Sequence, residues 1–145
     1  MNARNQTNVP AVVLSAISGK DVDLNIRFNS YSWSINGLSV GNLPARVRNY
    51  NLRVRAIRSS TLSALAEGND IAQLELTFKG EFPFEAVLNY RIGARHTGRE
   101  VYLYYFNATE RSLEFVGSIT VGERGFADLP IAKGTRYVLT SNPIH

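Results

Sequence analysis

The chain has 145 residues, of which 44% are hydrophobic and 19% are charged, and its formal net charge is +4. A chain of this length can form one domain that buries roughly two-thirds of its unfolded surface without disulfide staples. The absence of cysteine excludes disulfides, thiol catalysis and cysteine metal sites. No apolar run approaches the roughly 20 residues of a membrane span, and residues 1–10 lack the apolar run of a signal peptide.

The first part of the chain predicts two strands. Residues 10–17 place Val12, Leu14 and Ala16 on one face of an extended segment. Residues 21–28 alternate between apolar and polar side chains without a break, which is typical of a half-buried strand. We therefore expect both segments to be strands with one face toward a core.

A hairpin signal follows. Residues 31–35 alternate large apolar side chains with serine, and the pair Asn36-Gly37 is typical of a type I′ turn. This pattern predicts a hairpin whose second strand lies at residues 38–40. Trp33 is expected to pack into the core, because it alternates with serines on a short strand.

The middle of the chain changes period. Residues 50–57 predict a strand on which Arg53 and Arg55 share the outward face, because side chains alternate along a strand. Residues 60–67 carry apolar side chains at helical spacing, with a serine at the start as the candidate N-cap. We expect this segment to be the only helix.

The rest of the chain returns to the two-residue period of strands. The most apolar stretch, residues 101–116, reads as two strands joined by a polar turn near residues 107–112. Val101, Leu103 and Tyr105 share one face of its first strand. The other predicted strands lie at residues 71–78, 82–90, 117–121, 126–131 and 135–140.

About nine to eleven short strands with frequent turns are typical of an all-β protein. We expect a single β-sandwich of the immunoglobulin-like or jelly-roll type over residues 10–141, with a frayed segment at 1–9 and a tail at 142–145. The side chains expected in the core are Leu24, Ile26, Trp33, Leu52, Val54, Leu74, Leu76, Leu88, Leu103 and Tyr105.

The residues favour no catalytic chemistry. His96 and His145 are far apart in the sequence, and His96 is expected to be a solvent-exposed loop residue. No serine lies in a nucleophile-elbow context, and a glycosidase would need two carboxylates at a set separation across a cleft. We expect no enzyme activity, no metal and no cofactor.

Two side-chain pairs are candidate ligand-binding residues. Arg53 and Arg55 can bind carboxylates through their guanidinium forks, although a solvated face balanced by glutamates of a neighbouring strand is the simpler alternative. Tyr102 and Tyr104 stand about 7 Å apart on one strand, either packed or exposed as a row of rings for sugar. Stacking aromatics do not lie beside the arginines in the sequence, so nucleic acid is not expected.

Several segments are similar to one recurring module. They are residues 31–37, 68–74, 80–86, 98 and 101–107, 113–116 and 137–139. They resemble a β-sandwich domain of large extracellular or cell-surface proteins of Gram-positive anaerobic bacteria, found alongside dockerin, S-layer-homology or sortase-anchor segments. Arg136 departs from the pattern, which has a small polar residue before the final Tyr-Val-Leu.

The resemblance implies a non-catalytic accessory module on a secreted or cell-surface protein. The module would bind a polysaccharide or a cell-wall polymer, or attach its parent protein to the cell surface. The alternative is a structural spacer or protein–protein module with no small ligand, and an enzyme domain is a third, less favoured reading. Neighbouring modules of the parent protein are the other expected partners, and no membrane insertion is expected.

Overall fold

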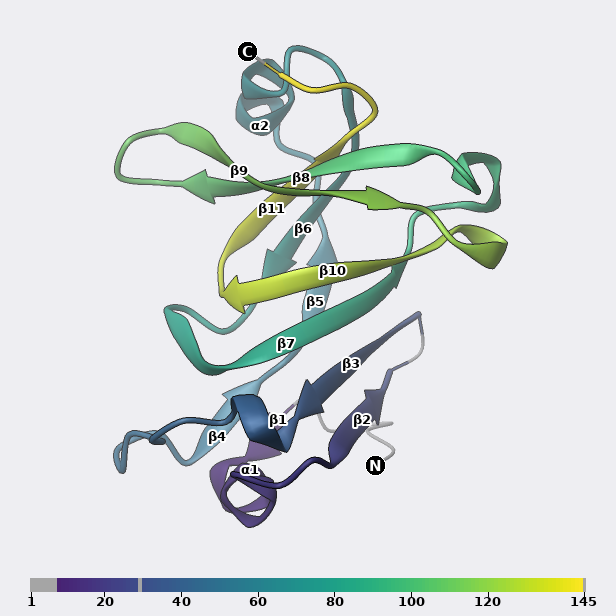
Figure 1. The fold of residues 1–145 in the computed structure, drawn as a ribbon. Helices are drawn as coiled ribbons and strands as arrows, with labels where there is room; N and C mark the ends of the chain where they lie inside the picture. The colour runs from purple at the N-terminus through teal and green to yellow at the C-terminus, as the bar shows by residue number, and fades with distance from the viewer. Residues whose placement is uncertain (1–7, 29, 145) are drawn as a thin grey trace.

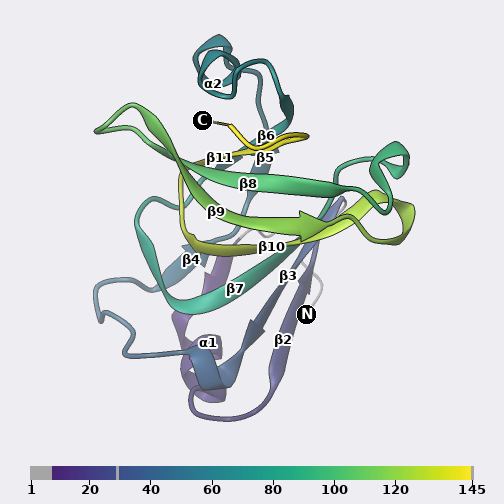
Figure 2. The same cartoon turned by 45° about the horizontal axis from the view of Figure 1, so that its top comes forward.

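The computed structural model describes residues 8–28 and 30–144 and consists of two main antiparallel sheets with a small strand pair at one end (Figure 1). This architecture confirms the expected all-β sandwich. Turned by 45°, the molecule shows β8 and β9 in an upper layer and β7, β3 and β2 below them, with β10 close beneath β9 (Figure 2).

The four-stranded sheet has the order β10-β7-β3-β2, and every neighbouring pair is antiparallel. Its strands are β2 (Asp23–Arg27), β3 (Tyr31–Asn36), β7 (Glu81–Arg91) and β10 (Phe126–Lys133). Strand β7 is the longest, and its buried side chains alternate with exposed ones over most of its length. The sheet therefore buries one face.

The five-stranded sheet has the order β5-β6-β11-β8-β9, so its central strand is the last one in the sequence. Its strands are β5 (Val54–Ala56), β6 (Asp70–Leu76), β8 (Glu100–Asn107), β9 (Ser112–Thr120) and β11 (Arg136–Thr140). Strands β8 and β9 form the hairpin predicted from residues 101–116, and Asn107 accepts backbone hydrogen bonds inside its turn. Strand β5 is an edge of this sheet.

Short elements complete the fold. A two-stranded sheet pairs β1 (Asn8–Pro10) with β4 (Asn49–Asn51). The helices are α1 (Ala11–Ile17) and α2 (Ser60–Leu65), and the 3-10 turns are η1 (Gly37–Ser39), η2 (Ala94–His96) and η3 (Glu123–Gly125). Helix α2 lies where the helix was predicted, and the hydroxyl of Ser59 accepts a hydrogen bond from the Leu62 amide as its cap.

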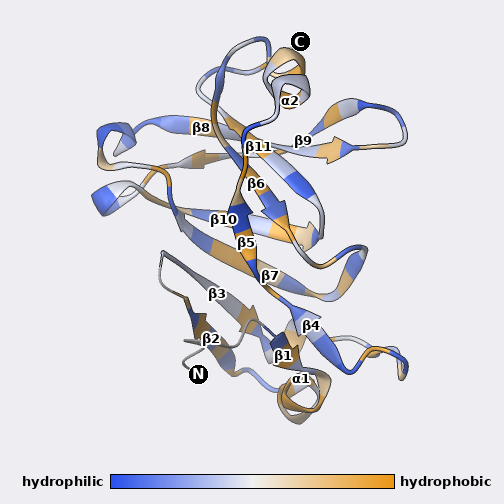
Figure 3. Ribbon diagram, turned by 180° about the vertical axis from the view of Figure 1, so that it is seen from behind, coloured by the Kyte–Doolittle hydropathy of each residue, from blue (hydrophilic) through white to orange (hydrophobic). Residues whose placement is uncertain are grey.

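The core lies between the two sheets. The predicted core side chains that are buried are Ile26, Trp33, Leu52, Val54, Leu74, Leu76, Leu88 and Leu103. Leu24 and Tyr105 are only half-buried and pack against this core. The Trp33 indole N–H donates to the Leu52 carbonyl at 2.9 Å, so the ring is both buried and hydrogen-bonded. Apolar and polar residues alternate along the strands in Figure 3.

The predicted strand at residues 10–17 is wrong, because this segment forms helix α1 directly after β1. The expectation that the segment at residues 60–67 is the only helix is therefore wrong as well. Ala11, Leu14 and Ile17 are three residues apart and face the core, whereas Val12 is 72% exposed. Proline just before or at the first helical position suits a helix start, because the missing N–H would have no partner there. The apolar residues of this segment fit both the two-residue period of a strand and the 3.6-residue period of a helix, and packing against the core selects the helix.

The predicted hairpin at Asn36-Gly37 is also wrong. Asn36 is extended, its side chain accepts a hydrogen bond from the Leu38 amide, and the chain continues into η1. Gly37 is required for a different reason, because a Cβ there would lie 2.0 Å from the Ile17 carbonyl oxygen and 2.5 Å from that of Lys20. The glycine thus permits close approach of two backbone segments.

The ends of the described chain are more ordered than expected. Of the segment predicted to be frayed, Asn8 and Val9 belong to β1, and Val9 is buried, while residues 1–7 lie outside the described residues. In the tail, the Ile144 amide donates to the Tyr104 hydroxyl at 3.0 Å. His145 lies outside the described residues.

Candidate functional site

Sheet register gathers charged side chains on the outer face of the five-stranded sheet. Arg55 on β5 lies opposite Glu75 on β6, and Glu75 lies opposite Arg136 on β11. The Arg55 guanidinium donates to one carboxylate oxygen of Glu75, and the Arg136 Nε donates to the other at 3.1 Å. The three residues form a row across three strands in which one carboxylate holds two guanidinium groups in place.

This row lies in a hollow of about 620 Å³, which we call the basic hollow. Its lining residues are Arg53, Arg55, Glu75, Leu76, Thr77, Lys79, Phe106, Ala108, Thr135 and Arg136. Four of them are cationic and one is anionic, so the lining carries a net charge of +3 (4 − 1). Two threonine hydroxyls and the Phe106 ring supply the neutral part of the surface.

The Glu75 carboxyl is held in its ionised form. The hydrogen bond from Arg136 is the largest influence and lowers the pKa of Glu75, and Arg55 lowers it further by a hydrogen bond and its charge. Partial burial acts in the opposite direction but does not outweigh the two arginines. A hydrogen bond to the charged form and a nearby opposite charge both favour ionisation.

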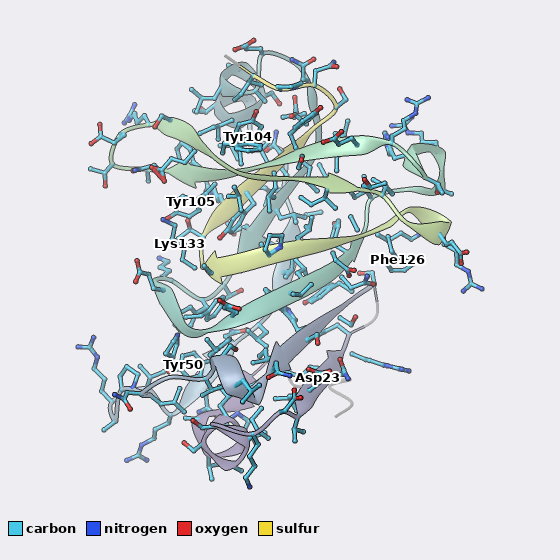
Figure 4. All side chains as sticks on the ribbon, viewed as in Figure 1. Asp23, Tyr50, Tyr104, Tyr105, Phe126 and Lys133 are labelled. Carbon is cyan, nitrogen blue, oxygen red and sulfur yellow. The ribbon has the colours of Figure 1, made fainter. Side chains whose placement is uncertain are left out.

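The two tyrosines predicted as ligand residues lie on β8 of the same sheet. Tyr104 is only 4% exposed, its hydroxyl accepts from Ile144, and its ring lies 5.5 Å from the Phe115 ring. Figure 4 shows Tyr104 and Tyr105 on opposite sides of β8. Tyr102 is half-buried and lines a separate shallow hollow of about 500 Å³ with Phe115 and Ile144. Tyr104 is therefore not an exposed ring.

The structure keeps the arginine pair and the tyrosine pair apart. Helix α2 covers the sheet through a small cluster in which Leu62 and Ala66 pack with Val138 of β11. Phe106 and Leu113 pack against this cluster, and each of them lines a different one of the two hollows. A ligand in the basic hollow would contact Arg53 and Arg55 but neither tyrosine.

Sequence reasoning missed part of this site. The sequence marks Arg136 only as a departure from the resemblance, and its pattern does not mark Lys79 or Phe106 as ligand residues. Arg136 shares one face of the last predicted strand with Val138 and Thr140, so the sequence could have predicted the side on which it lies. No comparable signal marks Lys79, which follows β6 in a turn.

His96 differs from its expected position. It is nearly buried in η2 and not a solvent-exposed loop residue. Burial is the main cause that lowers its pKa, and the charges of Arg95 and Arg99 lower it further. The described residues contain no group of three or more histidine, aspartate or glutamate side chains that could hold a metal ion.

A pH effect on stability follows from Glu75. Its pKa in the folded protein lies below the ordinary value of 4.5, so the unfolded chain binds a proton first on acidification. The stability that Glu75 contributes is therefore complete above about pH 4.5 and is lost as the pH falls through the lower pKa of the folded protein. We expect Glu75→Gln to give a shallower loss of stability below about pH 4.5 than wild type.

The measurement is urea unfolding of both proteins from pH 3 to 7. Glu110→Gln is the matched control, because among the described residues Glu110 makes no ion pair within 4.0 Å. Parallel pH profiles for wild type and Glu75→Gln would contradict the role assigned to the two arginines.

Comparison of the chain with protein families, curated proteins and solved structures found no match in any of the three. In the described part of the chain, no helix has both the length and the apolar character needed to cross a bilayer.

Proposed function

We propose that this chain is a non-catalytic accessory module of an extracellular or cell-surface protein and that its basic hollow binds an acidic polysaccharide. One observation carries the proposal. Four cationic side chains and a single carboxylate line one hollow together with Phe106, and two of the four cations contact the carboxylate. The sequence resemblance to modules of extracellular bacterial proteins supports the location and the accessory role.

The donors of the hollow suit a carboxylate-bearing sugar. Arg55 and Arg136 each use part of their guanidinium fork on Glu75 and retain further N–H groups for a ligand. Among the described residues, Arg53 and Lys79 make no ion pair within 4.0 Å. Guanidinium groups bind carboxylates through paired N–H donors, and the Phe106 ring offers an apolar face to sugar C–H groups.

The carboxylate of the hollow does not suit catalysis. Glycoside hydrolysis uses two carboxyl groups, of which one must be protonated to act as the acid. The basic hollow contains one carboxyl group, Glu75, and two arginines lower its pKa. This arrangement supports binding without bond cleavage.

The test is binding to a panel of polysaccharides by affinity electrophoresis and calorimetry. We expect retention by polygalacturonate, weaker retention by its methyl ester, and no retention by neutral glucan. Arg53→Gln/Lys79→Gln should weaken binding to polygalacturonate about tenfold or more, since a charge-assisted hydrogen bond contributes about 1.5–3 kcal/mol and 1.4 kcal/mol is tenfold. Added salt should weaken binding in the wild type.

The matched control is Arg46→Gln/Arg48→Gln, which removes two positive charges from exposed residues outside the basic hollow. Tyr102→Ala reports on the separate tyrosine hollow and should leave binding unchanged. If folded wild-type protein binds none of the polysaccharides, the basic hollow is not a glycan site and the spacer alternative is favoured.

One observation favours the alternative of a protein–protein module. Phe115 and Val116 are 61% and 40% exposed on β9, which is an edge strand of the five-stranded sheet. Exposed apolar side chains on a free strand edge are typical of sites where another chain adds a strand. However, Val116 lies at an irregularity of the β8–β9 ladder, and such bulges weaken edge pairing.

A further inference from the structure

A second hollow lies at the C-terminal end of edge strand β5, whereas Arg53 and Arg55 line the basic hollow at its start. It has a volume of about 450 Å³, and we call it the lateral hollow; the end of β5, α2, the start of β6 and the end of β7 line it. The lining side chains that matter here are Arg58, Ser60, Asp70, Gln73, Tyr90 and Arg91. Figure 3 views the molecule from the side on which β5 and β6 lie in front.

The segment that carries Arg58 is fixed to β6. The Ile57 amide donates to the Gln73 carbonyl at 3.0 Å. The side-chain oxygen of Gln73 accepts from the Ser59 amide at 2.7 Å, and its nitrogen donates to the Ser59 carbonyl at 3.2 Å. Gln73 is only 6% exposed, so these bonds hold the backbone on both sides of Arg58 in one place. The guanidinium of Arg58 projects from a rigid support.

Arg91 is positioned in a similar way from the opposite sheet. Its Nε donates to the Arg124 carbonyl at 3.2 Å, which leaves the two terminal nitrogens for a ligand. Within the described residues, neither Arg58 nor Arg91 makes an ion pair within 4.0 Å. Asp70, the carboxylate of the lateral hollow, accepts from Ser63 at 2.9 Å and from Gln73 at 3.1 Å. Two arginines without an ion-pair partner among the described residues therefore belong to the lining of this hollow.

The two hollows share strand β5. Arg53 and Arg55 line the basic hollow, and Arg58 lines the lateral hollow three residues later. At about 3.3 Å per residue, an extended chain from Arg53 to Arg58 spans roughly 16 Å. Strand β5 has a sheet neighbour only in β6, so no strand separates the two hollows along this edge.

We propose that an extended acidic polysaccharide runs along the β5 edge and occupies both hollows at once. This inference rests on the proposed function and specifies its ligand as an internal stretch of a polyuronate chain, longer than one sugar unit. Linking two weak sites through one ligand raises the overall affinity without any new contact. The module should therefore discriminate ligands by chain length.

The test is calorimetry with galacturonate and with oligogalacturonates of increasing length. Wild type should bind long oligomers at least tenfold more tightly than the short ones that fill only the basic hollow. Arg58→Gln/Arg91→Gln should remove about tenfold of affinity for long oligomers and leave short ones unchanged. Arg53→Gln/Lys79→Gln should weaken both, and Arg46→Gln/Arg48→Gln should weaken neither.

Two further measurements guard against a folding defect. Arg58→Lys/Arg91→Lys keeps both charges and should retain most of the length dependence. In wild type, long oligomers should shift the amide resonances of Ser59 and Arg91, whereas galacturonate alone should not shift them.

The outcomes separate the two proposals. Equal affinity for short and long oligomers would overturn the occupation of both hollows, and so would long-oligomer binding that survives Arg58→Gln/Arg91→Gln in folded protein. In either case Arg53→Gln/Lys79→Gln still tests the basic hollow. If no uronate binds to wild type, both proposals fail. Tighter binding of single-stranded DNA of equal charge, weakened by the same substitutions, would show that the ligand class is wrong.

Discussion

Replacing Gly134 with alanine is expected to lower the free energy of unfolding by about 3 kcal/mol or more, at the upper end of what overpacking costs. Gly134 lies between β10 and β11, where the chain passes from one sheet to the other. A Cβ at this position would lie 1.6 Å from the Phe78 carbonyl oxygen and 2.6 Å from its carbon. Both atoms are backbone, so no side-chain movement relieves the collision.

The same glycine holds two connections together. Its amide donates to the Gly80 carbonyl at 2.7 Å, which joins the β10–β11 connection to the β6–β7 turn. Lys79 lies in that turn, and Thr135 and Arg136 follow Gly134 directly. We therefore expect the substitution to disturb the basic hollow as well as the global stability, and denaturant unfolding measures the loss.

Gly117→Ala is the matched control for this prediction. Gly117 lies on β9, its φ is not positive, and no atom lies within 4 Å of a Cβ built there. Its substitution should change the free energy of unfolding by no more than about half a kcal/mol. Similar losses for both variants would show that the chain shifts easily at Gly134.

Leu103→Ala is expected to cost about 2–5 kcal/mol, the range for truncating a large side chain in a packed core. Leu103 is completely buried on β8, and its backbone lies between β11 and β9 in the sheet. A strand flanked on both sides moves little, so the space left by the truncation does not close and the lost contacts are not replaced.

Leu38→Ala removes the same atoms from a leucine that is 62% exposed in η1. This substitution should lower the free energy of unfolding by about half a kcal/mol or less, because little of the Leu38 side chain is buried. Thermal and urea unfolding of both variants give the comparison. A cost below half a kcal/mol for Leu103→Ala would mean that this face of β8 does not pack as described.

Local patterns predicted the strands whose two faces differ. Residues 71–78 alternate in a way that only an extended segment can bury, so the inward face of β6 followed from the sequence. Residues 10–17 lack that contrast and fit both periods. The Asn36-Gly37 pattern predicted a turn that requires glycine. The structure requires glycine at position 37 because the Ile17 backbone lies close to it, and a local pattern does not reveal such a long-range contact.

The candidate site was predictable only within one strand. A spacing of two placed Arg53 and Arg55 on one side of the predicted strand at residues 50–57 without knowledge of the sheet order. The structure divides that strand into β4 and β5, and Arg53 lies just before β5. Arg136 donates to the Glu75 carboxylate, which also binds Arg55, although the two residues are 61 positions apart in the sequence. No local pattern reveals such a pairing. The burial of Tyr104 likewise depends on the segment around Ile144, which lies 40 positions later.

The central place of β11 sets an order for assembly of the molecule. Strands β5 and β6 form one antiparallel unit and β8 and β9 form another, and in the sheet only β11 joins the two. Within this sheet, no strand pairing joins the two units until residues 136–140 are in place. Because closing such long loops is slow, folding is expected on the millisecond-to-second scale of sandwich proteins. Arg136 arrives with β11, so the basic hollow is completed only in this last step, and a chain stalled before residue 136 carries the arginines of β5 without their binding site.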